Sequence, residues 1–394
     1  MLNQLPSKLP DVGSTIFTEM SALALKCKAI NLGQGFPNYP PPEPLIQAVN
    51  AAMRQGHNQY APMAGLPQLR EVIASKVLGQ HGQDYSTETE ITVTSGATEA
   101  LMSSFLALTH PGDEVLLIDP AYDLYSPALR LAGATPVRVP MCPPKEDDPS
   151  FRIDWNRIES AITTRTRMLV LNFPHNPSGL TLKPEDLDAL ETLVSKRPLL
   201  LLSDEVYEHI VFDGKKHLSP VARPTLAERT VLISSFGKTF HATGWKIGYC
   251  CAPAQIMTEI RKIHQFTVFS VSTPMQAGIA RYLREPNIVS ELSDFYQRKR
   301  DRLIAGLKNT VLRPLTSEGT FFLLVDTQAL GAGLEKELAL SLTRELGVVS
   351  IPVSAFYADP DSPASNHQLL RLCFAKRDAT LDQALERLQG VKNC

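Results

Sequence analysis

Lys238 lies in a segment whose residue types suit covalent chemistry. The apolar, β-favouring run 230–233 leads into SSFGKTF at 234–240, so the lysine follows a strand in a turn flanked by hydroxyls and a glycine. A lysine in a partly dry, cation-rich site is the residue type that forms a Schiff base with an aldehyde cofactor. For an isolated lysine after a glycine, a solvated surface position is the commoner interpretation. Other segments therefore have to decide between the two.

A second segment places an acid after a buried strand. The continuous apolar run 199–202 predicts a strand buried on both faces, and Asp204 follows it closely. Ligands of open α/β sheets bind beyond the carboxyl ends of strands. A carboxylate there keeps a pyridine nitrogen protonated, and Tyr207 is close enough to reach the ring hydroxyl. A helix N-cap is the alternative role for Asp204.

Two more turns follow short apolar strands. Asn176 comes after the run 168–172, and its amide could donate to a phenolate oxygen, although a plain Asn-Pro turn is the alternative. The strand 91–94 leads into SGATEA at 95–100, where a helix N-terminus would offer free N–H groups to a phosphate. The groups that would form this phosphate site come from Gly96, Ala97, Thr98, Ser235 and Lys246.

Arg371 lies in an alternating strand, 369–374, near the C-terminus. A planar guanidinium is the side chain best suited to hold an α-carboxylate through two hydrogen bonds. An arginine that extends from the strand edge toward water is the alternative.

Together and in this order, the segments resemble the fold-type I, pyridoxal-phosphate-dependent aminotransferases of class I/II. The resemblance is strongest to the branch of methionine aminotransferases and kynurenine–oxoglutarate transaminases, and it covers nearly the whole chain. The motifs that carry it are NLGQGFP (31–37), QY (59–60), SGATEA (95–100), PAYDLY (120–125), PHNPSG (174–179), SDEVY (203–207), SFGKTF (235–240) and LRLCFA (370–375).

The resemblance implies roles for individual residues. Lys238, Asp204 and Tyr207 would be catalytic, and the Tyr122 ring would stack on the pyridine. Arg371 would hold the substrate carboxylate with help from Asn176 and the backbone of Gly35. Tyr60 would reach across a homodimer interface to the partner's cofactor phosphate. Three aromatic residues are candidates for the substrate side-chain pocket, with core or lid packing as the alternative: Phe36, Tyr39 and Phe269.

The expected reaction moves an amino group from an L-amino acid to a 2-oxo acid by a ping-pong mechanism. Acidic-donor members of the family use a second arginine, and the matching stretch 265–274 has none. We therefore expect apolar or aromatic donors, methionine first, with phenylalanine, leucine, kynurenine and glutamine as further candidates. A cysteine-conjugate β-lyase using the same cofactor stays open. A cofactor-binding transcription regulator is disfavoured, because no basic helix-turn-helix module precedes the first motif.

Composition limits the partners. The 394 residues are 43% hydrophobic and 20% charged with a net charge of −2, which gives no basic face for nucleic acid or an anionic membrane. The N-terminus lacks a signal peptide, and the six cysteines form no Cys-x-x-Cys pair, so a cytoplasmic protein with reduced thiols is expected. The nine histidines form no recognisable ligand frame, so no metal site is predicted.

The order of strands and helices predicts an α/β fold. Seven short apolar runs alternate with helical patterns and predict a mostly parallel seven-stranded sheet with helices on both faces: 91–95, 114–119, 135–139, 168–172, 199–203, 231–235 and 248–252. Residues 1–45 are predicted as an extended arm, which the resemblance assigns to a small domain. Residues 46–290 form the large cofactor domain, and residues 291–394 a small α+β domain, with a long helix at 279–310 between them.

Overall fold

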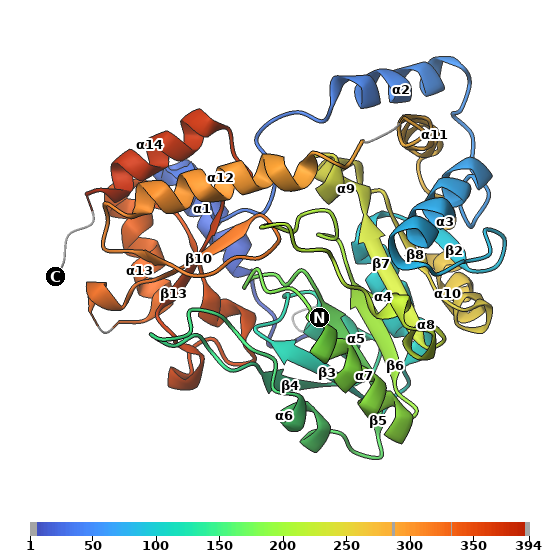
Figure 1. The fold of residues 1–394 in the computed structure, drawn as a ribbon, viewed down its shortest axis with the longest axis horizontal. Coiled ribbons are helices and arrows are strands. Elements are labelled where there is room, and N and C mark those ends of the chain that lie inside the picture. Colours follow the sequence, from blue (N-terminus) through green and yellow to red (C-terminus); the bar gives the residue numbers. More distant parts are fainter. Residues whose placement is uncertain (1–5, 286–287, 332, 391–394) are drawn as a thin grey trace, which may run out of the picture.

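The computed structural model describes residues 6–285, 288–331 and 333–390. Its central feature is a seven-stranded sheet with the spatial order β2-β8-β7-β6-β5-β3-β4 (Figure 1). Strand β8 is antiparallel to β2 and β7, and the other adjacent pairs are parallel, so the mostly parallel sheet is confirmed. The strands are β2 (Ile91–Thr94), β3 (Glu114–Asp119), β4 (Thr135–Pro140), β5 (Thr166–Asn172), β6 (Leu200–Asp204), β7 (Thr230–Ser235) and β8 (Gly248–Cys251).

Helices cover both faces of this sheet because successive strand residues point to opposite sides. In β3, Val115 and Leu117 enter the core beneath α4, α5 and α10, whereas Leu116 and Ile118 enter the core beneath α6 and α7. A further core joins the β2 end of the sheet to α2, α3 and α11. These helices are α2 (Glu43–Arg54), α3 (Pro67–His81), α4 (Gly96–Leu108), α5 (Tyr125–Leu131), α6 (Trp155–Ser160), α7 (Pro184–Lys196), α10 (Ala254–Thr267) and α11 (Thr273–Tyr282).

A second layered unit is built around a smaller antiparallel sheet with the order β12-β13-β10-β9. In Figure 1, α12 and α14 lie on the same side of the molecule as β10 and β13. The elements are β9 (Arg313–Pro314), β10 (Phe322–Asp326), β12 (Ile351–Pro352), β13 (Leu369–Cys373), α12 (Leu292–Leu307), α13 (Glu335–Ser341), which continues as a π-helical turn to Leu346, and α14 (Asp378–Leu388).

The N-terminal region is not wholly extended, so that prediction is wrong. Residues Ile16–Cys27 form helix α1, which the side chain of Thr15 caps by accepting a hydrogen bond from the amide of Thr18. The prolines that suggested an extended arm lie outside this segment, and the capping signal was overlooked. Strand β1 (Ile30–Asn31) pairs in parallel with β11 (Val348–Val349), so the N-terminal region shares a core with the C-terminal unit. The domain boundaries at 45/46 and 290/291 stay a prediction.

The continuous helix expected at 279–310 is also wrong. Helix α11 ends at Tyr282 and α12 begins only at Leu292. The sequence has a proline at 286, and a proline cannot donate the backbone hydrogen bond that a helix interior requires. The two helices therefore belong to different cores, α11 with α2 and α12 with α14.

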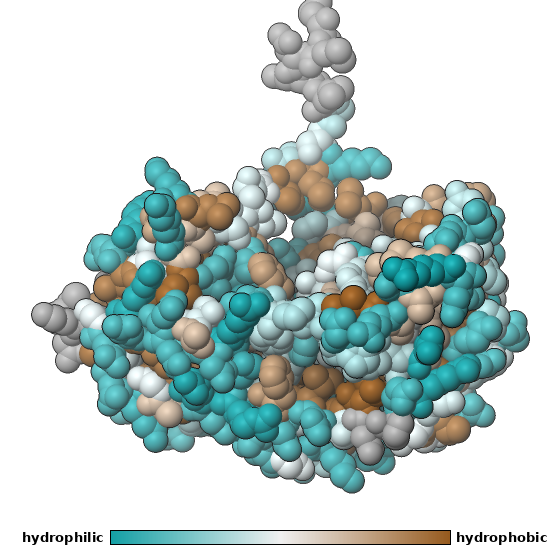
Figure 2. All heavy atoms as spheres, turned by 90° about the horizontal axis from the view of Figure 1, so that it is seen from above, coloured by the Kyte–Doolittle hydropathy of each residue, from teal (hydrophilic) through white to brown (hydrophobic). Residues whose placement is uncertain are grey.

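In the described residues, no helix is long and apolar enough to cross a membrane. The face seen in Figure 2 is mostly hydrophilic, with apolar atoms in small groups. The large hydrophobic side chains with the highest exposed fractions in the described chain are Leu25, Tyr60 and Phe266, each more than four-fifths exposed.

Candidate active site

A cavity of about 410 Å³ lies where the carboxyl ends of β5, β6 and β7 meet the second unit. This is the edge at which open parallel sheets bind ligands, and the volume falls within the usual range for small-molecule sites. Most of the residues singled out from the sequence line this one cavity: Gly35, Gly96, Ala97, Thr98, Tyr122, Asn176, Asp204, Tyr207, Ser235, Lys238, Lys246 and Arg371.

Lys238 projects into the cavity from the short helix α9 (Phe236–Thr239), directly after β7. Its Nζ donates to the backbone oxygen of Gly35 over 3.2 Å and lies 5.6 Å from the centre of the Tyr207 ring. Burial lowers the pKa of Lys238 to about 8, and the cations of Arg371 and Lys246 act in the same direction. A lysine with this pKa exists partly as the free amine near neutral pH, which is the nucleophilic and basic form.

Asp204 is the last residue of β6, and its carboxylate is almost completely buried. Oδ2 accepts a hydrogen bond of 2.6 Å from the hydroxyl of Tyr125. Burial raises the pKa of Asp204 to about 6, while the Tyr125 hydrogen bond opposes that rise. A fixed carboxylate in a dry site is a strong partner for a cationic ring nitrogen.

Arg371 lies at the centre of β13 with 1% of its surface exposed. Nη1 donates to Oδ1 of Asn176 over 2.6 Å, and Nη2 donates to the backbone oxygen of Gly33 over 2.9 Å. The guanidinium carbon is 3.9 Å from the centre of the Phe322 ring. Burial lowers the pKa of Arg371 to about 10, which leaves it charged at neutral pH. The guanidinium is thus held in one plane, as recognition of a carboxylate requires.

The N-terminus of α4 forms the opposite end of the cavity. Gly96 has a φ of 70°, and a Cβ at this position would lie 3.3 Å from Nζ of Lys246. Nζ of Lys246 donates to Oγ1 of Thr98 over 2.9 Å. Free amide groups at the start of a 13-residue helix, together with a lysine and a hydroxyl, form a site for a phosphate group.

A buried ion pair supports this phosphate end from behind. Glu99 accepts from the amide of Ser95 over 2.7 Å and from Nδ1 of His264 over 2.7 Å. Nε2 of His264 faces the backbone oxygen of Met63 at 2.8 Å, so both ring nitrogens meet acceptors. Although burial alone would lower the pKa of His264, the bond to Glu99 outweighs it and the pKa is raised. This support was not found from sequence, because its residues are far apart in the chain.

Four aromatic residues named from the sequence do not line the cavity. Phe36 is 44% exposed and lies under Nζ of Lys376, while the Tyr39 ring packs against His241 and Phe295. Tyr60 is 83% exposed, and its ring contacts Phe269 edge-on.

The cavity also contains residues that the sequence did not single out as functional. Tyr125 lines the cavity, although the sequence analysis assigned a role only to Tyr122 of the same PAYDLY motif. Asp123 also lines the cavity; burial raises the pKa of its carboxyl group, and the Arg371 charge opposes the rise. Phe17 and Phe322 complete the apolar wall beside Arg371. The helix that positions Phe17 was itself not predicted, and the signal that could have found it is the capping residue Thr15.

Comparison with known proteins identifies the family. Residues 28–388 match the family of class I and II aminotransferases. The chain is 48% identical to the methionine aminotransferase of Escherichia coli over 98% of both proteins. It is 34% identical to human kynurenine–oxoglutarate transaminase 1, covering 100% of this chain and 99% of the human protein. This chain is a class I/II aminotransferase.

Solved structures agree with this assignment. The crystal structure of an E. coli protein with methionine aminotransferase function superposes with a TM-score of 0.94 at 48% identity, covering 98% of this chain and all of that one. N-succinyldiaminopimelate aminotransferase from Mycobacterium tuberculosis gives a TM-score of 0.92 at 42% identity, covering 98% and 99%. The predicted fold type, the transferase class and the resemblance are therefore confirmed.

The cofactor of the family is pyridoxal phosphate, as predicted, and the cavity of this aminotransferase fits it. A phosphate suits the N-terminus of α4, where Gly96 leaves room that a side chain would fill. Asp204 suits the ring nitrogen and Lys238 the aldehyde carbon. The prediction that the enzyme holds no metal stays a prediction.

Proposed function

We propose that this aminotransferase moves the amino group of an apolar or aromatic L-amino acid, with methionine as the preferred donor, to a 2-oxo acid in a ping-pong reaction. The observation that carries the proposal is the cavity itself. A lysine with a lowered pKa, a buried acid and a fixed guanidinium line one space, and part of its wall is formed by the rings of Phe17, Tyr122, Tyr125, Tyr207 and Phe322.

The roles of the residues follow from their positions. Bound pyridoxal phosphate supplies an electron sink that makes the substrate Cα proton acidic. Asp204 holds the proton on the ring nitrogen, because its carboxylate is fixed by Tyr125 in a dry site. Lys238, as the free amine, takes the proton from Cα and returns it on the cofactor side. Arg371 binds the substrate carboxylate and so orients the bond to be broken.

Donor preference is inferred from the charges in the cavity. Arg371 is the only arginine among the described residues that line it, and Asn176 and Gly33 already orient that side chain. An acidic side chain would enter beside the Asp123 carboxyl group and the rings of Phe17 and Phe322, without a second guanidinium. Burial of an unpaired carboxylate is costly, whereas a thioether packs well against aromatic rings.

The proposal is tested with purified holoenzyme and a panel of amino donors at saturating 2-oxo acid. Methionine should give a kcat/KM at least about 100-fold above aspartate, since an unpaired buried polar group costs a few kcal/mol. N-succinyl-diaminopimelate belongs in the panel because a relative with 42% identity is named for it. A ranking headed by aspartate or by N-succinyl-diaminopimelate would contradict the proposed donor class. Parallel initial-velocity lines would support the ping-pong order, and intersecting lines would exclude it.

We further propose that the enzyme is a homodimer and that Tyr60 of each chain contacts the cofactor phosphate in the active site of the other chain. Its support is the position of Tyr60, which is 83% exposed and outside its own chain's cavity. Sedimentation should show a dimer, and mixing Lys238→Ala with Tyr60→Ala chains should restore activity in the mixed dimer beyond that of either parent. A monomer with full activity would contradict this arrangement.

A further inference from the structure

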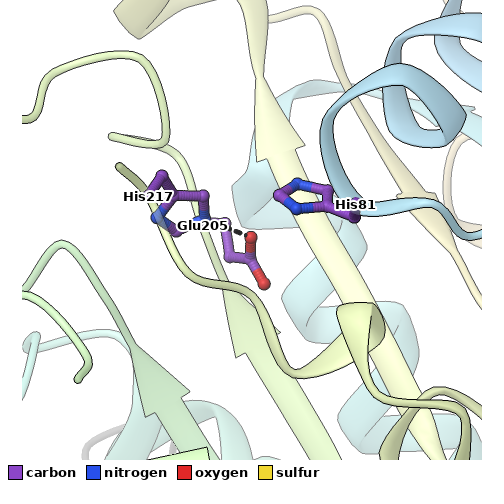
Figure 3. A group of neighbouring side chains, drawn as sticks. All are labelled: His81, Glu205 and His217. Atoms are coloured by element: carbon purple, nitrogen blue, oxygen red, sulfur yellow. Dashed lines mark hydrogen bonds and ion pairs between the residues drawn. The ribbon is translucent and has the colours of Figure 1, made fainter. Parts of the chain in front are cut away.

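A second group of reactive side chains lies outside the active-site cavity. It consists of His81, Glu205 and His217, and one ligand atom from each lies within 4.8 Å of the others. His81 is the last residue of α3, Glu205 directly follows β6, and His217 belongs to the segment between β6 and β7. Figure 3 shows the Glu205 side chain between the two imidazole rings. The group therefore joins three parts of the large sheet unit.

This group is separate from the catalytic cavity, although Glu205 follows Asp204. Asp204 lines the cavity, whereas Glu205 does not. Successive residues at the end of a strand point to opposite sides. The two neighbouring carboxylates consequently serve different sites.

Glu205 is held in a fixed orientation. Its Oε1 accepts hydrogen bonds from the hydroxyls of Ser203 over 2.7 Å and Ser219 over 2.6 Å. Its Oε2 lies 2.5 Å from Nε2 of His217. The side chain is 1% exposed, so this orientation does not depend on water. Carboxylates that bind a metal through one oxygen typically accept hydrogen bonds on the other oxygen, as Oε1 does here.

His81 differs from the other two members of the group because one of its ring nitrogens is buried without a hydrogen-bond partner among the described residues. Its Nε2 is buried, and no described residue is a hydrogen-bond partner of that nitrogen. Its ring meets the His217 ring edge-on with 5.7 Å between the centres. A buried polar atom without a partner is uncommon and requires an explanation.

The nearby charges leave room for a cation. Lys76 is paired with Glu208 at 2.5 Å, so its charge is balanced by a carboxylate outside the group. His209 is also directed toward Glu208, at 3.9 Å. Among the described residues, the hydrogen-bond and ion-pair partners of the Glu205 carboxylate are the hydroxyls of Ser203 and Ser219 and the imidazole of His217.

We propose that His81, Glu205 and His217 bind one divalent transition-metal ion, with zinc as the best match, and that a water molecule completes the coordination. Two imidazoles and a carboxylate form a common three-ligand zinc set, with ligand distances of about 2.0–2.2 Å. At about 2.0–2.2 Å from a tetrahedral ion, ligand atoms lie about 3.3–3.6 Å apart. The 2.5 Å contact between Oε2 of Glu205 and Nε2 of His217 must therefore open, and the longer separations of up to 4.8 Å must shorten, each by about 1 Å. The ion would fix the end of α3 to the residues that follow β6 and stabilise this part of the fold. The proposal does not depend on the identity of the amino donor.

The test measures zinc retention by the holoenzyme. The enzyme is stripped with a chelator, loaded with a small excess of Zn²⁺, desalted and analysed for metal per chain. Wild type should retain about one equivalent, and His81→Gln should lose at least nine-tenths of it, since one ligand of three is removed. His57→Gln is the matched control, because His57 is exposed and lies away from the group. Both variants should keep normal aminotransferase activity.

Two further measurements show whether the retained metal is bound at this group. His81→Cys should restore zinc retention, because a thiolate replaces the imidazole as a ligand. Co²⁺-loaded wild type should show visible bands of a four-coordinate site without a thiolate charge-transfer band, which separates this site from the free cysteines. Retention below a tenth of an equivalent in wild type, or equal retention in wild type and His81→Gln, would overturn the proposal.

Discussion

Replacement of Arg371 by lysine should weaken recognition of the substrate carboxylate without abolishing the chemistry. The guanidinium is 1% exposed and is fixed through Nη1 to Asn176 and through Nη2 to Gly33. It also lies over the Phe322 ring at 3.9 Å. Lysine keeps the positive charge but loses the planar pair of donors and much of the ring contact.

The size of the effect follows from the hydrogen bonds that change. A hydrogen bond to a charged group contributes about 1.5–3 kcal/mol, and every 1.4 kcal/mol corresponds to about tenfold in affinity. Loss of one such bond to the substrate carboxylate should lower kcat/KM for methionine by about 10- to 150-fold. Because the carboxylate is bound in both the ground state and the transition state, most of the loss should appear in KM.

The assay compares methionine with its decarboxylated amine. The amine lacks the group that Arg371 binds, so the ratio of kcat/KM values for methionine and the amine should fall in Arg371→Lys by the same factor. Arg377→Lys is the matched control, since Arg377 is exposed and lies outside the cavity. An unchanged ratio, or an equal loss for both substrates, would refute the assigned role of Arg371.

Three other outcomes are expected. Lys238→Ala should lower turnover by about 10²–10⁴-fold or more, because the base is removed. The cofactor should stay bound to this variant, but borohydride reduction should not fix it covalently to the chain. A covalent link after reduction would contradict the assignment of Lys238. Because burial holds the pKa of Lys238 at about 8, the rate of cofactor attachment to the apoenzyme should rise with pH and level off above about 8, whereas an ordinary lysine would continue toward 10.5. Burial raises the pKa of Asp204 to about 6, so the folded protein loses stability as the pH rises and this carboxyl group ionises. The Tyr125 hydrogen bond opposes the rise in pKa because it stabilises the ionised carboxylate, and Tyr125→Phe removes it. Urea unfolding of the apoenzyme should therefore show a loss of about 1.5–3 kcal/mol at pH 8 and a smaller loss at pH 5; equal losses would argue against the charged hydrogen bond.

Local sequence patterns were sufficient for most of the sheet and for the main chemistry. The buried runs that end at Asn172, Asp204 and Ser235 became neighbouring parallel strands, so their last residues reach one cavity. This is a property of parallel sheets, in which carboxyl ends share an edge, and it holds for any sequence of this pattern.

Two local errors have local causes. Helix α1 was missed because flanking prolines dominated the interpretation of a segment whose cap, Thr15, was present. Helices α11 and α12 were merged because the stretch 279–310 was interpreted as one long charged helix, although the sequence has a proline at 286.

The sequence by itself determined the family, the cofactor and the residue types at the ends of the strands. Only the tertiary structure decided which distant side chains meet. Tyr125 reaches Asp204 across 79 residues of chain, and Arg371 reaches Asn176 across 195. It also placed Phe36 and Tyr39 outside the cavity and brought His81 beside Glu205 and His217. Hydrophobic periodicity reports which face of an element is buried, but it does not report which other element covers that face.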